Sequence, residues 1–132
     1  MARGYQGGYI LGAMPEQQPH HQVLDGLLPQ HRALRQQIPD VYKGFATLSS
    51  AALSDGALSR KLKELMAMAI GIVQGCDGCI ASHAQGAARA GATAEEAAEA
   101  IGVTILMHGG PATIYGARAY TAFCEFVGVE PS

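Results

Sequence analysis

The fold is decided by residues 59–91, which read SRKLKELMAMAIGIVQGCDGCIASHAQGAARAG. Ser59 is a good N-cap for a helix over 60–73, in which apolar residues recur every three or four positions. Gly75 interrupts the pattern, and the helical period resumes over 76–90. This stretch therefore predicts two consecutive helices joined by a short turn.

Two more helices are expected before this segment. Apolar residues over 23–38 predict one helix that is broken near Pro29, because proline removes a backbone hydrogen bond inside a helix. A second amphipathic helix is predicted over 40–53, with turn residues after it. Residues 1–21 carry glycines and prolines without a helical period, so we expect a flexible N-terminal arm and a single helical domain over 22–132.

Two further helices are expected after the segment. Thr93 and Glu96 have the spacing of a capping box and predict a helix that continues to about Met107. Pro111 suits the first turn of a last helix, which extends to about Val127. The sequence thus predicts an all-α domain of about six helices.

Composition agrees with one small helical domain and excludes several functions. The chain has 132 residues, enough for one modest core, and no Trp among many small residues, which favours close-packed helices. Its 48% apolar content is high for this size, so we expect surplus apolar surface to meet other subunits. A net charge of −2 leaves no basic face for nucleic acid. With no signal-like start and no membrane-length apolar run, we expect no membrane partner and a cytoplasmic location.

We expect the reactive groups of this protein at a Cys-x-x-Cys pair, Cys76 and Cys79. Three cysteines do not make the disulfide framework of a secreted protein, so the pair indicates a redox or metal site. Cys76 and Cys79 would open a helix, where free backbone N–H groups and the positive helix end stabilise thiolate. Their spacing also permits a disulfide across one turn, and His83 follows Cys79 by one turn.

Glu64 joins this group if the two central helices fold back on each other about Gly75. Residues equidistant from the turn then face one another, which brings Glu64 near His83 to Gly86. A carboxylate in that position can orient the imidazole of His83, and the imidazole can serve a thiol as a base.

The pattern of Glu64, eleven residues, Cys76-x-x-Cys79, three residues and His83 resembles the AhpD branch of the alkylhydroperoxidase AhpD and carboxymuconolactone decarboxylase family. The similarity extends over about 38–126. It implies an oligomeric all-α bundle, a trimer or a hexamer, that is an alkylhydroperoxidase-like peroxidase or disulfide oxidoreductase. The substrate would be a hydroperoxide or a disulfide, the reductant an external dithiol or thiol, and no cofactor is expected.

The resemblance also implies roles. By position, Cys79 would be the peroxidatic nucleophile, Cys76 the resolving thiol, and His83 with Glu64 the proton relay. AhpD enzymes carry a further histidine just before the second cysteine, where this chain has Gly78, so part of that relay is missing.

Other assignments stay open at the level of sequence. His108, next to a predicted helix junction, is a candidate accessory base. Cys76, Cys79, His83 and Glu64 are also four zinc-competent ligands, which makes a metal-binding protein the main alternative. A noncatalytic oligomeric scaffold is a third reading. The decarboxylase branch lacks the cysteine pair, which disfavours decarboxylation of a carboxymuconolactone.

Overall fold

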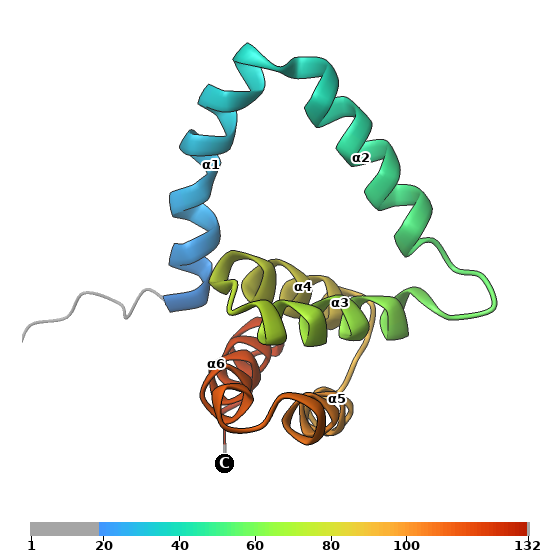
Figure 1. Ribbon diagram of the computed structural model, residues 1–132, viewed down its shortest axis with the longest axis vertical. Helices are drawn as coiled ribbons and strands as arrows, with labels where there is room; N and C mark the ends of the chain where they lie inside the picture. Colours follow the sequence, from blue (N-terminus) through green and yellow to red (C-terminus); the bar gives the residue numbers. More distant parts are fainter. Residues whose placement is uncertain (1–18, 132) are drawn as a thin grey trace, which may run out of the picture.

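The structure, a computed structural model, describes residues 19–131, and six helices form this part of the chain (Figure 1). The predicted all-α class and the number of helices are confirmed. In chain order the helices are α1 (Pro19–Gln37), α2 (Pro39–Leu53), α3 (Arg60–Gln74), α4 (Asp77–Arg89), α5 (Ala94–His108) and α6 (Gly110–Val127).

The core lies where the α3–α4 hairpin crosses α5 and α6 (Figure 1). Many fully buried side chains are alanines, so the helix backbones approach one another closely. Gly116 of α6 shows how closely, because a Cβ on it would lie 2.7 Å from Cγ2 of Ile101 in α5. The larger buried side chains are Met68, Ile72, Ile80 and Phe123.

The helix ends around this core follow their sequence signals. The Ser59 hydroxyl accepts a hydrogen bond from the Leu62 N–H at the start of α3. Thr93 and Glu96 form both hydrogen bonds of the capping box at the start of α5. Gly75 has a φ of 64° and ends α3 in the left-handed region, where a residue without Cβ is favoured.

The first helix differs from its prediction in two ways. α1 continues through Pro29 rather than breaking there. The carbonyl that loses its partner is that of Asp25, an exposed residue, so water can solvate it. α1 also begins at Pro19, so the last three residues of the predicted flexible arm are helical, while 1–18 lie outside the described residues.

α1 is anchored to the bundle at its N-terminal end. The carboxylate of Glu125 in α6 accepts hydrogen bonds from the backbone N–H groups of His20 and His21, at 3.2 and 2.8 Å. Beyond this anchor, α1 and α2 project from the bundle as an open V (Figure 1). Over residues 19–53, neither helix contains a buried side chain.

Candidate active site

Cys76 and Cys79 form a disulfide at the start of α4. Cys76 is the N-cap of α4, and its Sγ accepts a hydrogen bond from the Cys79 N–H at 3.2 Å. Cys76 is half-buried, whereas Cys79 is exposed. Both sulfurs therefore lie at the positive end of a helix dipole, which would stabilise a thiolate after reduction, and Cys79 is the more accessible of the two.

Glu64 reaches this region from α3. Its carboxylate Oε2 lies 2.8 Å from Nδ1 of His83 in α4. The contact expected from hairpin geometry is thus present. Glu64 is only 3% exposed, and its second oxygen, Oε1, lies 3.7 Å from the guanidinium of Arg60. The carboxylate is therefore buried with two basic groups around it, as a buried charge requires.

The Glu64 contact fixes how His83 can act. A carboxylate accepts a hydrogen bond from Nδ1–H, so neutral His83 keeps its lone pair on Nε2. The side chain is 30% exposed, which leaves the ring open to solvent and substrate. His83 follows Cys79 by one helical turn on α4. This arrangement can take a proton from a thiol or return one to a leaving group.

Two glycines make the close approach of α3 and α4 possible. A Cβ on Gly86 would lie 2.5 Å from the Glu64 carboxyl carbon, so the carboxylate occupies the space that a side chain would need. A Cβ on Gly71 would lie 3.2 Å from Cβ of Cys79. Glycine at these positions lets the α3 backbone pack directly against the residues of the site.

Two residues of α6, Tyr115 and Arg118, border the site, and neither was predicted from the sequence. The Tyr115 ring packs over Gly75, with its Cζ 3.3 Å from the position of a Cβ there. Arg118 lies over the Tyr115 ring and pairs with Asp77, between the two cysteines, at 3.5 Å. This ion pair is exposed and contributes little stability. Nothing in the local pattern around the cysteines signals a contact about 40 residues away.

Leu27 of α1 covers the position where the AhpD branch has its additional histidine. A Cβ on Gly78 would lie 3.1 Å from Cδ1 of Leu27. The first turn of α4 is therefore closed on this side by an apolar side chain from the projecting helix. A residue larger than glycine at 78 requires Leu27 to move.

His108, the remaining candidate from the sequence, lies elsewhere. His108 is the exposed last residue of α5, and α5 makes no contact with α4 within the described part of the chain. His108 is therefore not brought to the cysteine pair. Cys124 is a free, fully buried thiol in α6, and its hydrogen bond raises the pKa of the Tyr120 hydroxyl.

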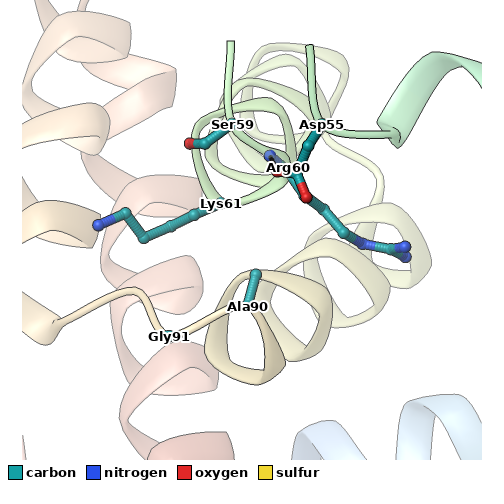
Figure 2. A pocket seen from close by; sticks show the side chains of 6 residues that line it. All are labelled: Asp55, Ser59, Arg60, Lys61, Ala90 and Gly91. Carbon is teal, nitrogen blue, oxygen red and sulfur yellow. Dashed lines mark hydrogen bonds between the residues drawn. The ribbon is translucent and has the colours of Figure 1, made fainter.

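A surface pocket lies at the other end of the hairpin, where α3 begins and α4 ends (Figure 2). The 15 residues of α3 span about 22 Å, which separates this pocket from the disulfide. It is thus not part of the redox site. Its lining residues are Asp55, Ser59, Arg60, Lys61, Ala90 and Gly91.

The four candidate metal ligands are not gathered around one point in this structure. Over residues 19–131, no three or more His, Cys, Asp or Glu side chains are grouped as metal ligands. The two cysteines are bonded to each other, while Glu64 and His83 pair side by side.

None of the described helices is both long and apolar enough to cross a membrane.

The sequence match and the all-α fold together identify the family of this chain. The model of the carboxymuconolactone decarboxylase family matches residues 39–122, and the chain belongs to this family. The predicted family is thus confirmed.

Individual relatives share most of the chain. A carboxymuconolactone decarboxylase family protein from Legionella pneumophila, solved in the apo form, is 38% identical with a TM-score of 0.80, covering 83% of this chain and 97% of its own. An uncharacterized Cupriavidus necator protein is 38% identical over 94 residues, which are 71% of this chain and 83% of that protein. Uncharacterized protein 4 in the cox locus of Paracoccus denitrificans is 39% identical over 84 residues, 64% of this chain and 76% of that protein.

Proposed function

We propose that this chain is a dithiol oxidoreductase that reduces hydroperoxides and is reset by an external dithiol. The observation that carries the proposal is the Cys76–Cys79 disulfide at a helix N-terminus, with Cys79 exposed one turn from a histidine that pairs with a buried glutamate. Family membership supports an activity of the peroxidase type, and the cysteine pair supports redox chemistry over decarboxylation.

The exposed Cys79 is the nucleophile in this proposal. His83 Nε2 takes the proton of the Cys79 thiol, and the helix N-terminus stabilises the thiolate. The thiolate attacks the distal oxygen of the hydroperoxide, the O–O bond breaks, and the departing alkoxide takes up the proton from His83 to leave as an alcohol. Cys79 is oxidised to a sulfenic acid and the peroxide is reduced.

Cys76 then resolves the sulfenic acid. Its thiol displaces water from Cys79–SOH, so that one S–S bond forms and one S–O bond breaks. The described structure corresponds to the oxidised state after this step. Cys76 is less exposed than Cys79, and its spacing within one turn keeps it in reach of Cys79.

An external dithiol completes the cycle. Its thiolate attacks the exposed sulfur of Cys79, and Cys76 leaves as a thiolate. The Cys79 N–H, which already donates to Cys76 Sγ, stabilises that leaving group. A second thiol of the reductant then releases Cys79, and the reductant ends as a disulfide. This step requires a reducing compartment such as the cytoplasm.

The test is hydroperoxide consumption with a dithiol such as dithiothreitol. Wild-type protein should consume the peroxide catalytically, and Cys79→Ser should reduce the rate by at least about 100-fold, because the reacting sulfur is lost. When the reduced protein meets peroxide without dithiol, Cys76→Ser should accumulate one sulfenic acid on Cys79 per chain and form no disulfide, because the resolving thiol is lost. Cys124→Ser is the matched control, since Cys124 is fully buried, and it should keep the wild-type rate.

Three results would contradict parts of the proposal. Equal rates for Cys79→Ser and wild type would remove the redox function. Sulfenic acid on Cys76 in the Cys79→Ser protein would exchange the two roles. Thiols that show no thiolate near neutral pH in a titration of the reduced protein would favour the noncatalytic scaffold.

A further inference from the structure

The buried carboxylate of Glu64 has two basic neighbours that differ in their chemistry. Its Oε2 lies 2.8 Å from Nδ1 of His83, and its Oε1 lies 3.7 Å from Nη2 of Arg60. An arginine side chain stays positively charged at every physiological pH, whereas an imidazole gains and loses its proton near neutral pH. The negative charge of Glu64 therefore faces one permanent cation and one group that can act as a base.

Arg60 is held in place through its backbone and its side chain. Its N–H donates a hydrogen bond to Oδ1 of Asp55 at 2.7 Å, which fixes the first residue of α3. Glu64 follows four residues later, so the guanidinium reaches the carboxylate along one face of the helix. The side chains of Arg60 and Lys61 leave the helix in different directions (Figure 2), and Lys61 pairs with Glu96 of α5 at 2.8 Å. Within this turn, Arg60 is thus the basic residue that contacts Glu64.

We infer that Arg60 is a positioning residue of the proposed relay, whose charge offsets the attraction of Glu64 for the His83 proton and so sets the pH range in which His83 can act as a base. This inference rests on the proposed function, because it concerns the histidine that serves Cys79. Beside Glu64 alone, the imidazole would be held as an imidazolium ion by a buried and weakly screened charge. Arg60 places a positive charge on the other oxygen of the same carboxylate and weakens that attraction.

The other charged groups of the helices that contact α3 are directed elsewhere or exposed. Asp77 of α4 pairs with Arg118 of α6 at 3.5 Å, and Glu125 of α6 pairs with His21 of α1 at 2.6 Å. Within residues 19–131, the ion pairs of Glu64 are those with Arg60 and His83. The remaining charged or basic side chains of these helices are exposed to solvent, namely Asp40, Lys43, Arg89, Glu95, Glu99 and His108.

The expected effect is moderate because Arg60 is partly solvated. An opposite charge within about 4–6 Å shifts the protonation midpoint of a titrating group by about 1–3 pH units. The Arg60 side chain is 56% exposed, so water and salt screen its charge and place it at the low end of that range. Loss of this charge should therefore raise the midpoint of His83 by about one pH unit, a change of about 10-fold in the ratio of imidazolium to imidazole at a given pH.

The test follows His83 itself by NMR in reduced protein labelled with ¹⁵N in histidine. The ring nitrogens report protonation and tautomer across pH, and the signal of His83 is the one lost in His83→Gln. In wild type, the neutral ring should carry its proton on Nδ1, which faces Glu64. Arg60→Met keeps a long side chain without the charge and should raise the midpoint by about one pH unit.

Two variants serve as controls for this measurement. Arg60→Lys keeps the charge and should reverse at least half of the shift seen in Arg60→Met. Lys61→Met removes a charge from the same turn that pairs with Glu96 and should leave the midpoint of His83 unchanged.

A kinetic measurement then separates a role in the relay from a structural one. Reduced protein reacts once with a hydroperoxide in the absence of dithiol, and free thiols are counted after an acid quench. In Arg60→Met the acid limb of the pH–rate profile should move up by the same amount as the NMR midpoint. In a Glu64→Gln background it should not move, because the exposed guanidinium is then no longer held at the site. A merely structural role would change the rate at every pH without moving the limb.

Three results would overturn the inference: an unmoved His83 midpoint in Arg60→Met, an equal shift in Lys61→Met, or an equal shift in the Glu64→Gln background. If Arg60→Met fails to fold, wild type decides the matter. Salt at about 1 M screens the exposed guanidinium more than the buried carboxylate, so the midpoint should rise, and a midpoint that stays or falls would overturn the inference. A wild-type protein that consumes no peroxide would remove the proposed function alone, since the NMR measurement uses no peroxide.

Discussion

The Glu64 carboxylate accepts a hydrogen bond from Nδ1 of His83 at 2.8 Å, although 19 residues separate them in the chain. The bond joins α3 to α4 and leaves Nε2 of His83 as the basic nitrogen. Because Glu64 is buried, its charge acts on the imidazole with less screening than at the surface. The proposed activity therefore depends on a residue that does not itself touch the sulfurs.

Glu64→Gln should lower the rate of peroxide consumption by about 10- to 100-fold, which is at or below the loss expected for removing a general base. The amide keeps the shape of the side chain but loses the negative charge that pairs with the imidazolium formed when His83 takes up a proton. The measurement is the pH dependence of the rate with saturating dithiol. Glu95→Gln, an exposed change on α5, is the control. A wild-type rate and pH profile in Glu64→Gln would remove Glu64 from the relay.

Gly86→Ala should destabilise the protein by about 1–3 kcal/mol, because the new methyl group overlaps the Glu64 carboxylate and overpacks the helix contact. It should also lower activity by displacing Glu64 from His83. Gly102→Ala is the matched helical control, since a Cβ there meets no atom of the described chain within 4 Å.

The Gly102→Ala variant should gain about 0.5–1 kcal/mol from helix propensity. Urea unfolding of the oxidised proteins measures both changes. If Gly86→Ala were as stable and active as wild type, the close contact between Gly86 and Glu64 would not exist in solution.

Gly78→His combined with Leu27→Ala should increase peroxidase activity by roughly 10-fold, at the low end of what a further acid–base group can contribute. The histidine supplies the relay residue of the AhpD branch, and truncating Leu27 makes room for it. Gly78→His alone should increase peroxidase activity by a smaller factor, because Leu27 must then move to make room for the histidine. The readout is kcat/KM for an alkyl hydroperoxide, with Leu27→Ala as the control. No gain in the double variant would mean that the histidine does not complete this site.

Glu96→Gln should destabilise the protein near neutral pH, and its loss of stability relative to wild type should shrink in acid. The hydrogen bond from Lys61, followed by that from the Thr93 backbone, lowers the pKa of Glu96 from its ordinary 4.5. A lowered pKa means that the unfolded chain binds the proton more tightly. The stabilisation is therefore present above pH 4.5 and is lost as the pH falls through the folded-state pKa.

Denaturant midpoints of wild type and Glu96→Gln, measured from neutral pH down to about pH 3.5, test this linkage. Lys61→Met should show the same trend, because it removes the other half of the ion pair. If the difference in denaturant midpoint between wild type and Glu96→Gln widened in acid, the prediction would be wrong, because the lowered pKa requires the difference to shrink.

The sequence by itself determined the helices, the cysteine pair and the Glu64–His83 contact. Caps and turns are local, so Ser59, Gly75 and Thr93 predict helix ends without knowledge of the rest of the chain. The short turn at Gly75 then forces an antiparallel hairpin, and residues equidistant from it must meet. One local prediction, the break near Pro29, was wrong because the freed carbonyl is exposed to water.

Only the tertiary structure decided which surfaces are buried and what borders the site. Apolar residues of α3 recur at helical spacing both among its buried and among its exposed side chains, so periodicity alone does not tell which of them meet the core, and Glu64 proved to be buried. Leu27 and Arg118 reach the first turn of α4 from helices far away in sequence, and Tyr115 packs over Gly75 just before it. Such contacts depend on how the helices pack, which is a property of the whole chain and not of any single segment.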